Sequence, residues 1–80
     1  MTWKTGDRVI IGCNGESFAG QIALASVGWL SLFLTFDAMI AGHAGAMPVL
    51  LDDDKIYRTL TEPRAEIALR RWAEPNETGV

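Results

Sequence analysis

The stretch of residues 17–36 contains no charged side chain, and this feature limits the possible folds most strongly. A run of about 20 apolar residues is long enough to cross a membrane as a helix. Here, however, polar residues and glycines interrupt the run: Gly20, Gln21, Ser26, Gly28, Ser31 and Thr35. From residue 30 to 36 the pattern alternates, with Leu32 and Leu34 on one side and Phe33 on the other. Because a period of two is typical of strands, the stretch predicts β-structure and not a membrane span.

Turn signals divide the rest of the chain into short strands. Asn14-Gly15 is a strong hairpin signal, and further turns are expected at 27–28, 52–54 and 61–64. Between the third and fourth strands, Asp37 is a suitable N-cap for one helical turn over residues 38–41, which Gly42 would end. Pro48 then begins a strand, where a missing N–H costs no ladder bond. The expected strands are Arg8–Cys13, 18–26, 29–36, 48–52, 56–60 and 65–70.

Strands of this length and spacing favour a single small barrel or sandwich over residues 1–70. Closure of the sheet would also remove exposed edges from strands that are this apolar. The last ten residues, 71–80, are rich in turn-forming and charged residues, and we expect a disordered tail whose start is held by Trp72.

The opening of the chain resembles the first hairpin of SH3-like small barrels, which include Tudor-type and KOW-type modules. The likeness rests on Gly6-Asp7 before the first strand and on the return segment Gly20-Gln21-Ile22. It implies an SH3-like barrel, and with the helical turn predicted after Asp37 the expected fold is all-β: a five- to six-stranded SH3-like barrel with one short helical turn between strands 3 and 4. The segment FDAMIAGHAGAMPVLLDDDKIYRTL, residues 36–60, is similar to short bacterial proteins of unassigned function carried on mobile, integron-type gene cassettes.

Composition narrows the function classes. The chain is 49% hydrophobic and 21% charged, whereas an average chain carries about 25% charged residues. This surplus of apolar side chains predicts a homodimer or a higher homo-oligomer. The net charge of -3 makes nucleic-acid binding unlikely, because a protein needs a dense face of basic residues to neutralise the phosphates. Cys13 is the only cysteine, so no internal disulfide forms, and with no signal peptide in the first residues a cytoplasmic location is expected.

His43, the only histidine, is the most chemically versatile side chain of the sequence. A ligand site around it would draw on Asp37, and Tyr57 is a third candidate. The first hairpin and the pair Ile56-Tyr57 are also similar to the plasmid-borne type II dihydrofolate reductases, which are tetramers with one central pore. The glutamine with which those enzymes grip substrate and cofactor is missing here. We therefore assign no catalytic residue, and we expect no cofactor and no metal, since 52–54 is typical of a solvated turn.

The predicted interface is apolar. Trp29 and Phe33 lie opposite the leucines of their strand, so both cannot fill the same core, and the loop that follows carries further apolar side chains. The interface candidates are Trp29, Phe33, Met39, Ile40 and Met47. The leading hypothesis is a non-enzymatic binding or assembly module that self-associates. The alternatives are a small-ligand or catalytic site at a subunit junction near His43, and, by analogy of fold alone, a nucleic-acid- or ribosome-associated module.

Overall fold

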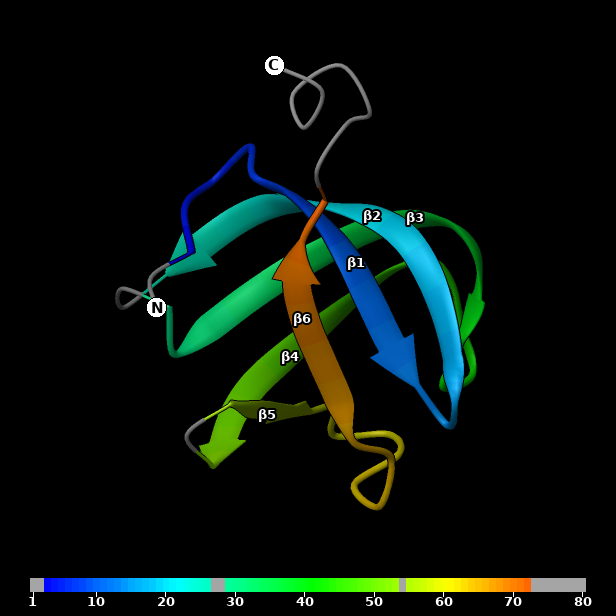
Figure 1. Cartoon of the computed structure of the whole chain (residues 1–80). Coiled ribbons are helices and arrows are strands. Elements are labelled where there is room, and N and C mark those ends of the chain that lie inside the picture. Colours follow the sequence, from blue (N-terminus) through cyan, green and yellow to red (C-terminus); the bar gives the residue numbers. More distant parts are fainter. Residues whose placement is uncertain (1–2, 27–28, 54, 73–80) are drawn as a thin grey trace.

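Six antiparallel strands form a closed barrel in which each strand pairs with its neighbours in the sequence and the last returns to the first (Figure 1). The computed structural model describes residues 3–26, 29–53 and 55–72. The strands are β1 (Arg8–Cys13), β2 (Glu16–Ser26), β3 (Ser31–Ile40), β4 (His43–Asp53), β5 (Ile56–Arg58) and β6 (Ile67–Arg71). The all-β barrel expected from the sequence is therefore confirmed, with six strands.

The predicted boundaries lie within two residues of the observed ones except at the end of β3 and the start of β4. Strand β1 was expected at the observed residues, β2 begins two residues earlier than expected, and β5 is shorter. Strand β6 extends to Arg71, and the Trp72 N–H continues this pairing by donating to the Arg8 carbonyl at 3.2 Å. The expected turn at 27–28 and the rest of the predicted tail, 73–80, lie outside the described residues.

The helical turn predicted after Asp37 is wrong, and no helix occurs in the part of the chain that the structure describes. Strand β3 continues to Ile40, which pairs with His43 of β4 across a two-residue turn. Ala41 and Gly42 both have positive φ, 49° and 81°, as a type I′ hairpin turn requires. The pairing of β3 with β4 overrides the local helix propensity of this segment, because it buries Ile40, which is 1% exposed.

Pro48 does not begin a strand but lies inside β4, opposite Phe33. Backbone bonds in an antiparallel pair alternate in direction. Since the Leu51 N–H donates to the Leu30 carbonyl at 2.8 Å, the nitrogen of Pro48 points away from β3. On that side β5 pairs with β4 only from Leu50 onward. The proline therefore costs no ladder bond and protects an otherwise open strand edge.

The interior of the barrel is filled by apolar side chains from all six strands, with Trp3 and Ala65 closing it from the flanking segments. The fully buried side chains include Val9, Ile11, Ile22, Leu32, Leu34, Ile40, Met47, Val49 and Ile67. Cys13 is 5% exposed and belongs to this core. The core fixes which face of each strand points outward, and the candidate sites all lie on that outer surface.

Candidate functional site

An apolar surface covers the outer side of strands β2, β3 and β4. Leu24 pairs with Phe33, and Phe33 pairs with Pro48, so the three side chains form a row across three strands. Leu50 lies two residues beyond Pro48 on the same face. Leu24, Phe33 and Leu50 are 55%, 41% and 48% exposed. We call these four residues the Phe33 face.

A β-bulge brings Leu24 onto this face. Regular alternation would place Ile22 and Leu24 on the same side of the strand, yet Ile22 is fully buried and Leu24 is exposed. The register of β2 against β3 shifts between these two residues, which turns Leu24 outward. The sequence did not predict this bulge, because the alternation of apolar and polar residues does not reveal an extra residue in a strand.

The surroundings of the Phe33 face are polar or small but mostly uncharged. Ser31 pairs with Leu50 and with Ser26, and Thr35 pairs with Ala46. The nearest cation in register is Arg58, which pairs with Leu50. A charge-free apolar row with a polar rim is the composition expected of a protein interface.

The predicted interface residues are divided by the fold. Trp29, Phe33 and Met39 are 37%, 41% and 63% exposed and remain available at the surface. Ile40 and Met47 are 1% and 0% exposed. These two side chains fill the chain's own core because β3 and β4 pair through them, so they are removed from the predicted interface.

Tyr57 supports the end of the Phe33 face and not a ligand site. Its ring is 2% exposed, and its hydroxyl donates to the Trp29 carbonyl at 2.5 Å. This bond joins β5 to the segment that leads into β3. Burial raises the pKa of the Tyr57 hydroxyl above its usual value of 10.0.

His43 contacts two threonines that the sequence did not point to. Its Nε2 atom lies 2.5 Å from Thr61 Oγ1 and 3.3 Å from Thr59 Oγ1, and the two hydroxyls are 3.4 Å apart. Thr59 is buried, at 3% exposure, whereas Thr61 is exposed. The cluster joins the start of β4 to the segment after β5. It satisfies the hydroxyl of Thr59 in a position where an unpaired polar group would be costly.

Asp37, Tyr57 and His43 do not share hydrogen bonds. Asp37 is exposed in the irregular part of β3, and within the described residues it has no hydrogen-bond or ion-pair partner. The bonds of Tyr57 and His43 go to Trp29 and to the two threonines. The three residues predicted for a ligand site are thus not joined by hydrogen bonds: Tyr57 and His43 each bond elsewhere in the chain, and Asp37 bonds to neither.

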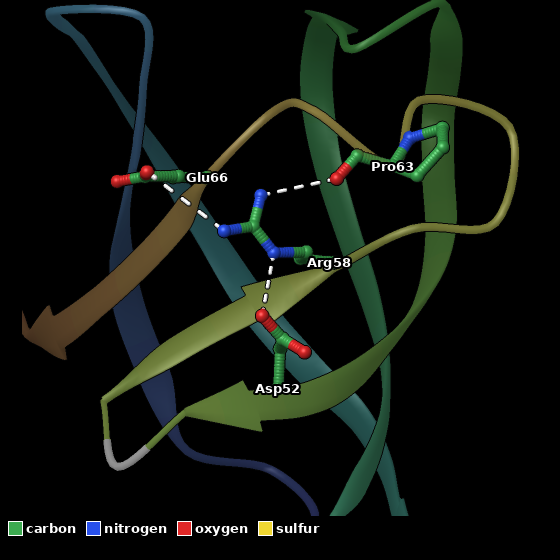
Figure 2. Close-up of polar contacts among 4 residues, drawn as sticks. All are labelled: Asp52, Arg58, Pro63 and Glu66. Carbon is green, nitrogen blue, oxygen red and sulfur yellow. Dashed lines mark hydrogen bonds and ion pairs between the residues drawn. The ribbon is translucent and has the colours of Figure 1, made fainter.

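Arg58 is the centre of the best-connected polar cluster (Figure 2). Its Nε bonds Asp52 Oδ2 at 2.7 Å, its NH1 donates to the Pro63 carbonyl at 3.0 Å, and its NH2 lies 3.8 Å from Glu66 Oε2. These contacts tie the end of β4 and the loop before β6 to β5. The hydrogen bond with Asp52 raises the pKa of Arg58 further, so it stays charged. The cluster is structural, since each of the three guanidinium nitrogens of Arg58 contacts an acceptor within the chain.

The described residues contain no group of three or more His, Cys, Asp or Glu side chains arranged to hold a metal ion. Burial, and then the carboxylates of Glu16 and Glu62, raise the pKa of the Cys13 thiol above 9.0. A buried thiol with a raised pKa is a poor nucleophile at neutral pH. Among these residues, no helix is long and apolar enough to span a bilayer.

Comparison with known proteins gave no significant match to a family model, to a curated protein or to a solved structure. The fold and the geometry of its surface are therefore the basis on which function is argued.

Proposed function

We propose that this chain is a small bacterial, cytoplasmic barrel of the SH3-like, cassette-borne kind, and that it acts as a non-enzymatic assembly module that self-associates through the Phe33 face. The supporting observation is the cross-strand row of Leu24, Phe33 and Pro48, continued by Leu50, which contains no charged residue. Exposed apolar rows of this kind mark interaction surfaces.

The size of the face suits a second copy that docks by two-fold symmetry. A large apolar side chain has about 150–250 Å² of surface, so the measured exposures leave roughly 300 Å² of contiguous apolar area on each copy. A stable interface buries about 800 Å² per partner, and the rest would come from Trp29, Met39 and the polar rim. Two-fold docking places each Phe33 near its counterpart and matches uncharged surface with uncharged surface. Such a modest apolar core predicts a dissociation constant of about micromolar order.

The test is sedimentation velocity of purified protein over a range of about 1 to 100 µM. We expect a dimer to dominate at the upper end. Phe33→Glu should leave only monomer, because it buries a charge in both halves of the interface, and the dissociation constant should rise more than about 100-fold.

Leu60→Glu is the matched control. Leu60 is 82% exposed and lies outside the Phe33 face, so it receives the same chemical change without meeting the partner. A wild-type monomer at about 100 µM would refute self-association. Equal dissociation by the Leu60 and Phe33 variants would refute this face as the interface.

The alternative of a small-ligand or catalytic site near His43 has less support. The Nε2 atom of His43 is already bonded within the chain, and neither Asp37 nor Tyr57 contacts it through a hydrogen bond. An activity like that of the type II dihydrofolate reductases has no support beyond the few matching residues.

A further inference from the structure

A groove of about 360 Å³ lies on the outer side of β1, β2 and β3 and borders the rim of the Phe33 face at Thr35. Its walls include Arg8 and Trp72 on one side and Thr35 on the other, and its floor is formed by the small residues Ala19 and Gly20 beside Gln21. Arg8 pairs with Gln21 and Gln21 with Thr35, so these residues form one row across three strands. We call this feature the Arg8 groove.

The groove presents a planar cation. The guanidinium of Arg8 lies over the Trp72 ring, 4.1 Å from its centroid. Stacking on one face holds the guanidinium flat, while both residues still line the groove. A planar guanidinium held in this way can take a second flat ring on its other face, as arginines do with unstacked bases.

The polar groups of the groove favour a ligand rich in acceptors. Besides the arginine, Gln21 contributes an amide nitrogen, of which one hydrogen is directed to the Gly6 carbonyl at 3.4 Å. Thr35 contributes a hydroxyl whose hydrogen is directed to the Gln21 carbonyl at 3.5 Å. Among the described residues that line the groove, none has a carboxylate. Since the amide has two hydrogens, Gln21 can still donate to a ligand.

Arg8 and Arg70 place two cations at this end of the barrel, although the chain as a whole is acidic. Arg70 lies on β6 opposite Ile10, which makes it a diagonal neighbour of Arg8 on the same outer face. Asp7 directly precedes Arg8 in the chain. Its carboxylate forms an ion pair with Arg71 at 3.5 Å and accepts a hydrogen bond from the Lys4 N–H at 2.9 Å. The other described acidic residues, apart from Asp37, belong to the opposite end of β1 and β6: Glu16, Asp52, Asp53, Glu62 and Glu66. Figure 1 shows this separation, with the start of β1 and the end of β6 at the top and the β4–β5 end at the bottom.

We propose that the Arg8 groove binds a nucleotide, with the base stacked on the Arg8 guanidinium and the phosphate directed toward Arg70. A free nucleotide and a single-stranded nucleic acid offer the same base and phosphate, and the experiment separates the two sources. The net charge of -3 opposes binding of long duplexes, whereas one nucleotide depends on the local charges around the groove, where the carboxylate of Asp7 is paired with Arg71.

The experiment measures fluorescence anisotropy of a labelled 12-residue oligothymidylate at about 50 mM salt, and displacement of this probe by AMP and by inorganic phosphate. We expect saturable binding that Arg8→Ala weakens about 5- to 100-fold, the range of one lost base stack. Gln21→Glu should weaken it as strongly, since it places a carboxylate in the groove at an exposed position. Arg70→Ala should lower affinity and make the dependence on salt less steep by about one phosphate contact.

Arg64→Ala is the matched control, because Arg64 is an exposed arginine at the opposite end of the barrel. Its affinity should equal that of the wild type, and circular dichroism should show that every variant is folded. Displacement by AMP supports a free nucleotide, and binding of the oligonucleotide without displacement by AMP supports a single strand. The proposal is overturned if neither probe binds at about 1 mM, if Arg64→Ala weakens binding as much as Arg8→Ala, or if phosphate displaces as well as AMP. The Phe33→Glu monomer should retain binding, so this site and self-association are tested separately.

Discussion

Gly20 in β2 is the position where the addition of a single methyl group should cost the most. A Cβ built at this glycine would lie 2.5 Å from Ile11 Cδ1 and 2.9 Å from the Thr35 carbonyl oxygen. Ordinary carbon contacts are about 3.5–4.0 Å, and the carbonyl belongs to a paired backbone that cannot move freely. Overpacking of this kind costs about 1–3 kcal/mol. Replacement of glycine by alanine also restricts the unfolded chain, which returns about 0.4–1 kcal/mol.

The net expectation for Gly20→Ala is a loss of about 1–2 kcal/mol in the free energy of unfolding. The same change at Gly12 provides the comparison, because a Cβ there would meet only ordinary contacts, the nearest at 3.6 Å from the Ala68 carbonyl oxygen. Gly12→Ala should be neutral or slightly stabilising. Urea unfolding measures the difference, and for a small domain with a slope near 1 kcal/mol/M the two midpoints should differ by about 1–2 M.

A double variant identifies the atoms responsible. Ile11→Val removes the methyl group that lies 2.5 Å from the new Cβ, so part of the cost of Gly20→Ala should disappear in its presence. The coupling should be at least about 0.5 kcal/mol. Equal stability of Gly20→Ala and Gly12→Ala, or strict additivity with Ile11→Val, would refute the steric explanation.

Two further predictions concern stability. Ala41 has a φ of 49°, a conformation that asparagine tolerates better, so Ala41→Asn should raise the free energy of unfolding by about 0.5–1 kcal/mol and an unchanged thermal midpoint would contradict this. The pKa values of Cys13 and Tyr57 are raised in the folded chain above 9.0 and 10.0, so the unfolded chain releases these protons first. The contribution of these two groups to the free energy of unfolding should therefore be fully present below about pH 9 and decline as the pH rises beyond it. Urea midpoints should show the decline, and a double variant Cys13→Ala, Tyr57→Phe should reduce its dependence on pH.

The physical basis of the two proposals differs. Self-association depends on apolar area that the barrel leaves outside, whereas the Arg8 groove depends on where a few charges lie on an acidic chain. The first was expected from composition, although two of its predicted members, Ile40 and Met47, are buried. The second was not expected, because a net charge describes the whole chain and not the arrangement of its parts.

Local signals in the sequence determined the strands, the Asn14-Gly15 hairpin and the burial of alternate residues such as Leu32 and Leu34, because these depend on neighbours along the chain. Only the tertiary structure decided where the strands bulge and which side chains the bulges turn outward. One bulge turned Leu24 outward, and the pairing of β3 with β4 converted the expected helical turn into a hairpin. Pairing with distant strands also brought Arg8 beside Trp72 and joined His43 to Thr59 and Thr61. Register and closure arise from the packing of the whole core, and a one-residue shift reverses the face of every side chain that follows.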